Sequence, residues 1–411
     1  MRVGLIGETL GHSRSPELHA LLADYDYHLW PLAPEELGAF MRARDFDGLN
    51  VTIPYKQAVI PHLDGLSPEA RRAGSVNTVV KRADGTLFGD NTDLCGMAEM
   101  TRRAGMRLGT GKTLVLGSGG TSRTACALAR EAGGEPVVIS RRGENTYENL
   151  ERHADARWLI NATPVGLYPH THEAPVDLRR LPGLRGVADA IYNPLRTRLL
   201  QQARELRIPC EGGLCMLVWQ AARAVERFTG EAPEAARVEH ALLTLRRRGL
   251  NVALVGMPGT GKSTVGALVG KALGLETVDI DAEIAREAGM SIPAIFAAEG
   301  EAGFRAREAA LIRRYGRESG RVLVTGGGAV LSPENRESLR LNGYVAHITR
   351  PIERLAMDGR PLSQSREALA ALWRTRAPLY AACADGVFPN DKQPGDCARA
   401  IVEGFHEALC D

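Results

Sequence analysis

Short apolar runs alternate along this chain with longer segments in which apolar residues recur every three or four positions. The runs RVGLIG, TLVLG, PVVIS, WLINAT, GVADAIY, NVALVG and RVLVTGG have the length of buried strands. Segments such as SRTACALAREAGG and STVGALVGKALG have the spacing of helices that bury one face. Strands that alternate with helices in this way predict an α/β fold with largely parallel sheets.

Two of these strands lead into glycine-rich turns that open a helix, one at Gly117 and one at Gly256. Their glycine patterns differ, so we predict two nucleotide sites and not a repeat. Between them, EAARVEHALLTLRRRG is typical of a closing helix with basic residues in its last turn and Gly249 as its stop. Because 411 residues exceed one ordinary core, we predict two domains, 1–248 and 249–411, with the boundary within 246–250.

Composition narrows the class of protein. The chain is 44% hydrophobic and has no apolar run near the roughly 18 residues of a membrane helix, which predicts a globular protein. Its start leads into a strand and not into a signal peptide, so we expect a cytoplasmic location. The net charge of +2 predicts small-molecule partners, with no nucleic acid and no membrane, and leaves the oligomeric state open.

The rare residues are more informative than the common ones. Seven cysteines without C-x-x-C spacing predict reduced thiols, and we expect Cys95, Cys126 and Cys215 to be small core residues. Of 51 basic residues only six are lysines. A lysine inside a motif is therefore informative, because its proton is lost more readily than that of arginine.

The segment GMPGTGKST lies between a strand and a helix, the context that G-x-x-x-x-G-K-[ST] requires. In such a loop the backbone N–H groups surround phosphate, Lys262 reaches the β and γ oxygens, and Ser263 is placed for Mg²⁺. A glycine-rich turn with a chance lysine is the alternative. The motif predicts ATP-binding residues Gly256, Gly259, Thr260, Gly261, Lys262, Ser263 and Thr264.

The next strand ends in TVDIDAEI. Side chains alternate along a strand, so we expect Asp279 and Asp281 to project to the same side, toward the phosphate loop. We assign Asp279 to Mg²⁺ and Asp281 to a substrate hydroxyl. The alternative is a helix cap, which suits one of the two aspartates better than both.

The motifs EAGFRARE, VTGGGAV, DGRPLS and RTRAPLY follow, and with them residues 250–411 resemble shikimate kinase. The resemblance implies that Arg305 and Arg376 hold the shikimate carboxylate, since arginine forks suit a carboxylate. It implies that Arg360 comes from a lid onto the transferring phosphate. Each arginine seen alone is typical of a solvated surface. The resemblance further assigns the ring hydroxyls to the backbone of Gly326, Gly327 and Gly328, and adenine stacking to Arg354.

In the first domain, TLVLGSGGTSRTACALA gives a strand, a tight glycine turn and a helix. Ser122 replaces the third glycine of G-x-G-x-x-G, so this motif alone is weak. The next strand ends in Arg141 and Arg142, where an NAD site would have an acidic residue. Two arginines suit the 2′-phosphate of NADP. The alternative is a solvated basic turn.

Upstream motifs suggest the chemistry of a ketone reductase. Reduction by hydride requires a proton for the new alkoxide, and Lys56, at the end of NVTIPYK, is a suitable donor with Asp93 as its partner. Asp93 could instead cap a helix. Ser15 followed by Pro16 is typical of a helix start, where serine hydroxyls also attract a carboxylate.

Together GHSRSPELHALL, FDGLNVTIPYK, GSVNTV, GDNTDLCG, NATPVGLYP and DAIYNPLRTRLL resemble shikimate dehydrogenase over about residues 1–245. The resemblance implies a substrate lobe of about 1–95 with returning helices of about 213–245, and a Rossmann lobe of about 96–212. It makes Lys56 and Asp93 the catalytic pair. It implies the substrate-binding residues Ser13, Ser15, Asn50, Thr52, Asn77, Tyr192 and Gln220. It implies the NADP-binding residues Gly117, Ser118, Gly119, Gly120, Thr121, Ser140, Arg141 and Arg142.

The two resemblances imply successive enzymes, in which 3-dehydroshikimate is reduced with NADPH and shikimate is then phosphorylated with ATP and Mg²⁺. Three alternatives stay open at this stage. The first half could be a quinate dehydrogenase that uses NAD, or the second half a gluconate or nucleotide kinase. Either half could also be a ligand sensor without catalysis, since a fold does not fix a function.

Overall fold

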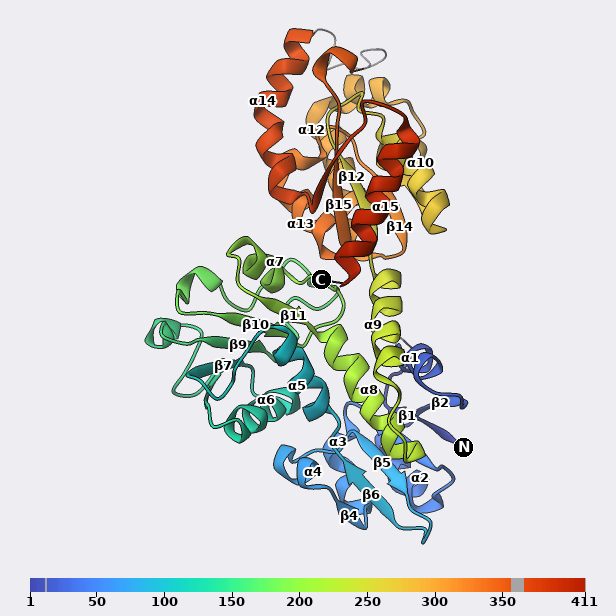
Figure 1. Ribbon diagram of the computed structural model, residues 1–411, viewed down its shortest axis with the longest axis vertical. Helices are drawn as coiled ribbons and strands as arrows, with labels where there is room; N and C mark the ends of the chain where they lie inside the picture. Colours follow the sequence, from blue (N-terminus) through green and yellow to red (C-terminus); the bar gives the residue numbers. More distant parts are fainter. Residues whose placement is uncertain (12, 356–365, 411) are drawn as a thin grey trace. The chain divides into compact units, whose positions relative to one another are not determined.

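The computed structural model describes residues 1–11, 13–355 and 366–410 and confirms the predicted α/β class (Figure 1). The chain divides into two compact units. The first consists of Met1–Asn193 and Thr197–Leu245, and the second of Pro194–Arg196 and Arg246–Asp411. No helix of the described residues is both long and apolar enough to cross a bilayer.

The first sheet of the first unit has the strand order β2–β1–β3–β5–β6–β4. Strand β1 pairs in parallel with β2 and β3, whereas β5 is antiparallel to both β3 and β6. The strands are β1 (Val3–Gly7), β2 (Tyr27–Pro31), β3 (Gly48–Val51), β4 (Gly65–Leu66), β5 (Thr78–Lys81) and β6 (Leu87–Asp90). The helices of this lobe are α1 (Ser15–Leu22), α2 (Leu37–Ala43), α3 (Tyr55–Ala58), α4 (Pro68–Ala73), α8 (Gly213–Thr229) and α9 (Ala235–Gly249).

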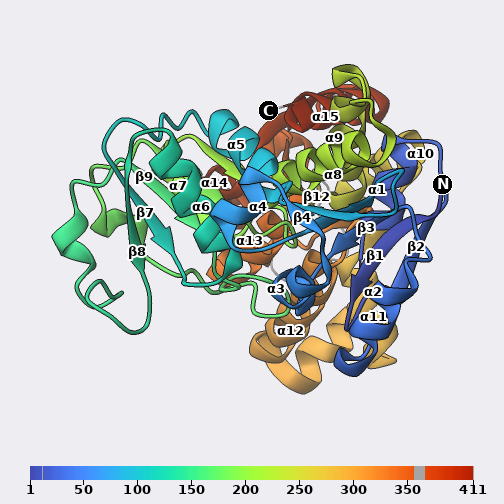
Figure 2. The same ribbon diagram turned by 90° about the horizontal axis from the view of Figure 1, so that it is seen from below.

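The second sheet of this unit is parallel throughout, with the order β11–β10–β9–β7–β8. Because side chains alternate along a strand, Val115 packs on the face covered by helices α5 and α6, whereas Leu114 and Leu116 pack on the face of α7. The elements are α5 (Asp93–Arg103), β7 (Lys112–Leu116), α6 (Gly120–Glu131), β8 (Glu135–Ile139), β9 (Trp158–Asn161), β10 (Gly186–Asp189), α7 (Arg198–Glu205) and β11 (Cys210–Gly212). Helices α5 and α8 pack against each other between the two sheets (Figures 1 and 2).

The second unit contains a parallel sheet with the order β13–β14–β12–β15–β16. Helices α10 and α15 pack together on one face, and α12, α13 and α14 cover the other (Figure 1). The elements are β12 (Asn251–Val255), α10 (Lys262–Leu273), β13 (Glu276–Asp279), α11 (Ile280–Ala288), α12 (Ile292–Arg317), β14 (Arg321–Val324), α13 (Pro333–Leu341), β15 (Gly343–Thr349), α14 (Arg366–Cys383), β16 (Gly386–Pro389) and α15 (Pro394–Cys410).

The cysteines of the first unit correct one expectation. Cys126 and Cys215 are buried as predicted, but Cys95 is exposed. Cys95 lies on α5, whose buried residues are Leu94, Gly96, Met97, Met100 and Thr101. A helix turns by 100° per residue, so a position flanked by buried residues can still point to solvent.

Candidate active sites

A cavity of about 380 Å³ lies in the first unit. Strands β1 and β3, helices α1, α3, α5 and α8, and the residues that follow β10 contribute its lining. The fold brings together here every residue that the sequence assigns to the first substrate and its reduction. These are Ser13, Ser15, Asn50, Thr52, Lys56, Asn77, Asp93, Tyr192 and Gln220.

Lys56 and Asp93 form an ion pair on the wall of this cavity. The Lys56 ammonium donates to Oδ2 of Asp93 at 2.6 Å, and the Asp93 side chain is only 13% exposed. Thr92 occupies the N-cap position of α5, and Asp93 is the first helical residue, whose Oδ1 accepts from Asn77 at 2.9 Å. The helix-cap alternative for Asp93 is therefore wrong. The pair provides a proton donor whose position is fixed by a carboxylate.

The amides on the cavity wall are oriented by buried partners. The Tyr27 hydroxyl donates to Oδ1 of Asn50 at 2.7 Å, and the Thr92 backbone N–H donates to Oδ1 of Asn77 at 2.7 Å. Behind them the ring of His19 stacks on Tyr27 with a centroid distance of 4.0 Å. Burial lowers the pKa of His19 to about 3, so this layer is uncharged near neutral pH.

The two serines lie where α1 begins. Arg14 occupies the N-cap position and Ser15 is the first helical residue, one position later than a capping serine would be. The Ser15 backbone N–H donates to Oγ of Ser13 at 3.2 Å. Both serines line the cavity beside the amino end of the helix, where a negative group is favoured.

The glycine turn after β7 has the geometry of a pyrophosphate site. Gly117 has a φ of +102°, and a Cβ there would lie 3.0 Å from Cγ2 of Thr163 and 3.1 Å from the carbonyl oxygen of Ala162. At Gly119 a Cβ would meet no atom within 4 Å, so the backbone is open to a ligand. Helix α6 begins at Gly120, and its amino end faces this opening.

The end of β8 adjoins this turn, because the Gly117 N–H donates to the carbonyl of Ile139 at 2.8 Å. Ser140 begins a tight turn in which its N–H donates to the carbonyl of Asn145 at 3.1 Å. Arg141 and Arg142 are exposed within that turn. The structure thus places two exposed arginines next to the glycine turn, as a 2′-phosphate site requires.

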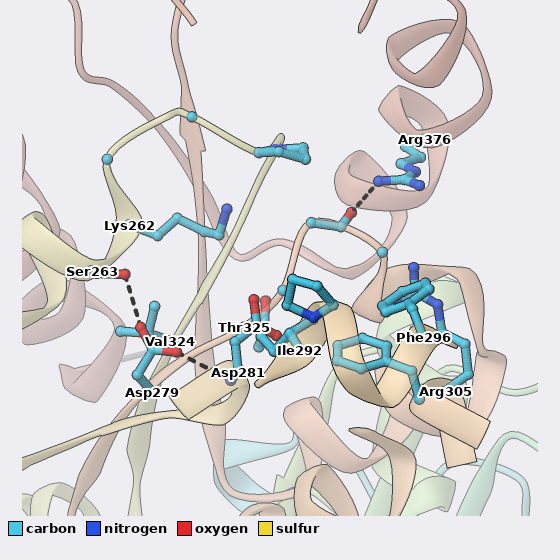
Figure 3. A pocket seen from close by; sticks show the side chains of 18 of the residues that line it. Lys262, Ser263, Asp279, Asp281, Ile292, Phe296, Arg305, Val324, Thr325 and Arg376 are labelled. Atoms are coloured by element: carbon cyan, nitrogen blue, oxygen red, sulfur yellow. Dashed lines mark hydrogen bonds between the residues drawn. The ribbon is translucent and has the colours of Figure 1, made fainter. Parts of the chain in front are cut away.

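A second cavity, of about 420 Å³, lies in the second unit (Figure 3). It brings together the phosphate loop, both aspartates, the three consecutive glycines and two arginines that the sequence singled out. These lining residues are Gly259, Gly261, Lys262, Ser263, Thr264, Asp279, Asp281, Arg305, Gly326, Gly327, Gly328 and Arg376.

Backbone carbonyls of the phosphate loop bind the ammonium of the loop's own lysine. The Lys262 ammonium donates to the carbonyls of Gly256 and Met257, both at 2.9 Å. Gly256 has a φ of +148°, and a Cβ there would lie 2.3 Å from the carbonyl oxygen of Ile348. The Thr260 hydroxyl donates to Met257 at 3.0 Å and does not line the cavity, so only its backbone is available to phosphate.

Asp279 caps a helix and also accepts from Ser263, while the Mg²⁺ role predicted for it stays a prediction. Its Oδ1 caps α11 by accepting from the N–H groups of Asp281 and Ala282, while Oδ2 accepts from the Ser263 hydroxyl at 2.8 Å (Figure 3). Asp281 lies in the first turn of α11, not on the strand. Both aspartates line the cavity as expected, but the strand alternation that predicted this is wrong, because β13 ends at Asp279.

Two arginines line the far end of this cavity. Nη1 of Arg305 donates to Oε2 of Glu308 at 2.8 Å, and Nη1 of Arg376 donates to the Gly327 carbonyl at 3.0 Å. A Cβ on Gly328 would lie 2.2 Å from Nη2 of Arg305, so the guanidinium lies directly against that glycine. Two arginine forks beside a glycine turn can bind a carboxylate.

Comparisons with known proteins connect both sites to families. Residues 5–79 match the model of the shikimate dehydrogenase substrate binding domain, and residues 213–243 match that of the shikimate 5'-dehydrogenase C-terminal domain. A shikimate dehydrogenase (NADP(+)) from Thermus thermophilus is 38% identical over 270 residues, covering 61% of this chain and 100% of the relative. The chain belongs to the shikimate dehydrogenase family. Residues 258–406 match the model of shikimate kinase, so the chain is a fusion that also carries a shikimate kinase domain.

Solved structures agree with the dehydrogenase assignment. A chorismate mutase/shikimate 5-dehydrogenase fusion protein from Clostridium acetobutylicum is 32% identical, with a TM-score of 0.56 over 59% of this chain and 96% of that one. A shikimate 5-dehydrogenase from Thermus thermophilus in complex with NADP(H) and shikimate is 36% identical, with a TM-score of 0.53 over 59% of this chain and 98% of that one. We therefore name the first unit the dehydrogenase unit and the second the kinase unit.

In the shikimate dehydrogenase unit, sequence analysis missed the apolar part of the cavity. Met216 and Leu217 lie one turn before Gln220 on α8, and Leu10 and Thr9 precede the two serines. Apolar residues carry no chemical signature of their own. The helical spacing from Met216 to Gln220 is the signal that could have shown them on one face.

In the shikimate kinase unit, the main residue missed is Glu308. It is completely buried and lies three residues after Arg305 on α12, a spacing that places the two side chains on one helix face. Burial raises the pKa of Glu308 above its usual value, and the neighbouring Arg305 opposes this shift. Glu308 holds Arg305 in place at the wall of the cavity.

Two arginines of the kinase unit were assigned by resemblance alone. Arg354 is exposed, donates to the carbonyl of Asp391 at 2.9 Å and does not line the cavity. Arg360 lies outside the described residues. Adenine stacking by Arg354 and phosphate binding by Arg360 therefore stay predictions.

Proposed function

We propose that this chain catalyses two successive steps, the NADPH-dependent reduction of 3-dehydroshikimate to shikimate and the phosphorylation of the shikimate 3-hydroxyl by ATP. We assign the first to residues 1–248 and the second to residues 249–411. The observation that supports this most directly is that Lys56 and Asp93 line one cavity in the first unit, and Lys262 and Asp281 line one cavity in the second. The product of the first site is then the substrate of the second.

In the first site Lys56 acts on the ring ketone. Addition of hydride to the carbonyl carbon leaves an alkoxide, and the Lys56 ammonium supplies the proton for that oxygen. Asp93 keeps the ammonium in place through the 2.6 Å ion pair. Ser13 and Ser15 hold the carboxylate beside the amino end of α1. The ring oxygens bind to Asn50, Thr52, Asn77 and Gln220. Tyr192 lines the cleft beside the ring.

The turn after β7 fits NADPH, which supplies the hydride. The open backbone at Gly119 and the amino end of α6 suit a pyrophosphate. Arg141 and Arg142 suit the 2′-phosphate that distinguishes NADP from NAD. Gly117, Ser118, Gly120, Thr121 and Ser140 complete this site through the backbone and short hydroxyls.

In the second site Asp281 acts on the shikimate hydroxyl. It orients or deprotonates that hydroxyl for attack, while Lys262 and Arg360 stabilise the charge on the transferring phosphoryl group of ATP. Arg305 and Arg376 hold the carboxylate, and the Gly326–Gly328 backbone approaches the ring.

The kinase unit also fits Mg²⁺, which neutralises phosphate charge. The Ser263 hydroxyl and Asp279 Oδ2 would hold it, and they lie 2.8 Å apart. Mg²⁺ commonly takes one or two protein ligands and completes its shell with water and phosphate oxygens. A pair of protein ligands is therefore sufficient.

The test is one incubation of the full chain with 3-dehydroshikimate, NADPH and Mg-ATP, repeated with each cofactor omitted and followed by product mass. We expect shikimate without ATP, shikimate phosphate with all components, and no product without NADPH. The same incubations with quinate and NAD, and with gluconate or nucleosides and ATP, test the alternative enzymes. Consumption of NADPH without a phosphate ester would contradict the kinase assignment, and absence of any turnover would indicate a ligand sensor.

A further inference from the structure

Tyr380 is a buried residue of the kinase unit that the reaction scheme above does not use. It lies on α14, four residues after Arg376, and its side chain is fully buried. Its ring stacks on His347 with a centroid distance of 4.8 Å and an interplanar angle of 24°. The ring is therefore held by packing, and its hydroxyl lies beside Arg376 and donates to one backbone partner.

That partner is the carbonyl of Gly327, which accepts from the Tyr380 hydroxyl at 2.6 Å. The same carbonyl accepts from Nη1 of Arg376 at 3.0 Å (Figure 3). On the other side of Gly327 a Cβ would lie 2.5 Å from Cδ of Pro258, so the glycine is packed against the phosphate loop. The peptide between Gly327 and Gly328 is thus fixed by two hydrogen bonds on one side and by contact on the other.

The orientation of this peptide has two consequences in the cavity. In a planar trans peptide the N–H of Gly328 points opposite to the carbonyl of Gly327, so fixing one group fixes the other. The bond to Gly327 also occupies Nη1 of Arg376 and leaves the edge formed by Nε and Nη2. Nε of Arg376 is buried and has no hydrogen-bond partner among the described residues. Arg376 lines the cavity, where its remaining guanidinium N–H groups can bind a carboxylate.

Arg376 and Tyr380 lie four residues apart on α14, a spacing that places their side chains on one helix face. The carbonyl of Gly327 joins both side chains to one atom of the glycine turn.

We propose that Tyr380 is a positioning residue for the kinase reaction, which fixes the Gly327 carbonyl and thereby orients Arg376 and the Gly328 amide toward the carboxylated substrate. This inference rests on the proposed phosphorylation of shikimate. It concerns substrate binding and not the phosphate loop.

The test is the Tyr380→Phe variant of the full chain, which keeps the ring and its stacking and removes only the hydroxyl. We expect the KM for shikimate to rise about three- to tenfold, the range of one buried hydrogen bond, while the KM for ATP stays within about twofold. Tyr315→Phe is the matched control, since its hydroxyl donates to Glu283 at 3.1 Å and neither residue lines the cavity. Dehydrogenase activity of each preparation reports the amount of intact chain.

A double-variant cycle tests whether Tyr380 acts through Arg376. In an Arg376→Lys background we expect Tyr380→Phe to raise the KM for shikimate by less than about twofold, because coupled residues are not additive. If Tyr380→Phe lowers thermal stability, the kinetics are repeated below the unfolding transition of the variant.

The outcomes separate this inference from the proposed function. Wild-type phosphorylation of shikimate combined with an unchanged KM in Tyr380→Phe would overturn the inference and leave the function intact. Equal increases in both KM values, or fully additive effects with Arg376→Lys, would also overturn it, because they indicate general loosening. Failure of the wild type to phosphorylate shikimate would overturn both.

Discussion

Lys56 and Asp93 lie 37 positions apart in the sequence and meet at 2.6 Å on the wall of the dehydrogenase cavity. Lys56 comes from a short helix after β3, and Asp93 from the first turn of α5, which follows β6. The strand between them, β5, runs antiparallel to both β3 and β6 and so brings their ends together. The ion pair is a product of this sheet order.

Replacement of Lys56 by alanine should abolish reduction. Loss of a positioned proton donor costs about 10²- to 10⁴-fold in kcat, and we expect a loss in that range for 3-dehydroshikimate reduction. Kinase activity of the same chain should stay within about twofold. Lys81→Ala is the matched control, because its side chain is also 30% exposed in this lobe but donates to the backbone of Arg44. Reductase turnover retained in Lys56→Ala would contradict the assignment.

Replacement of Lys262 by methionine should abolish phosphorylation and leave the dehydrogenase activity intact. The phosphate loop loses the ammonium that reaches the transferring group, so we expect a fall of about 10²-fold or more in kinase kcat. Dehydrogenase kinetics should not change. Lys271→Met, on the last turn of the same helix, provides the control. Formation of shikimate phosphate at the wild-type rate by Lys262→Met would show that the site is misplaced.

Replacement of Arg141 and Arg142 by alanine should change the cofactor preference. A charge-assisted hydrogen bond contributes about 1.5 to 3 kcal/mol, so we expect the KM for NADPH to rise about 10- to 100-fold. The KM for NADH should stay within about twofold, because NADH lacks the 2′-phosphate. The measurement is initial-rate kinetics with both cofactors on the double and single variants. Equal losses with NADPH and NADH would indicate that these arginines form only a solvated turn.

Gly328→Ala should impair shikimate binding by the kinase unit. The added Cβ would lie 2.2 Å from Nη2 of Arg305, whose guanidinium is held by Glu308 at 2.8 Å and has little freedom to move. We expect the KM for shikimate to rise about tenfold or more, the effect of losing a charge-assisted contact. Gly395→Ala is the control, since a Cβ there meets no atom within 4 Å. Unchanged shikimate kinetics in Gly328→Ala would argue against a carboxylate site at Arg305.

The kinase unit should lose stability as the pH falls from 6.5 to 4. Burial, with a smaller contribution from Lys262, lowers the pKa of His347 from 6.5 to about 4. The unfolded chain therefore binds a proton in this window that the folded chain does not, so stability is full above pH 6.5 and declines below it. The contribution of His347 to this loss in the free energy of unfolding is about 3 kcal/mol.

His347→Phe should reduce this loss, because phenylalanine keeps an aromatic ring between Trp373 and Tyr380 and cannot titrate. Urea unfolding of the full chain, followed by hydrogen exchange of the β15 peptide, measures the kinase unit separately. If the free energy of unfolding of His347→Phe falls with decreasing pH as steeply as that of the wild type, other groups cause the pH dependence.

Local sequence was sufficient for the phosphate loop and its flanking elements, because this motif is continuous in the chain. NVALV followed by GMPGTGKST specifies a strand, a loop and a helix within a few turns, because glycine conformations and helix starts depend on near neighbours. The same holds for the turn at Gly117 and for the residues of both cavities that lie inside such motifs.

Tertiary structure decided which of these motifs meet and what each side chain does there. Sequence alone could not show that Asp279 uses one oxygen as a cap and the other for Ser263, or that Cys95 points to solvent. It could not join the Tyr380 hydroxyl to Gly327, 53 positions away. Hydrogen bonds between distant residues depend on how sheets and helices pack, and no local pattern encodes that packing.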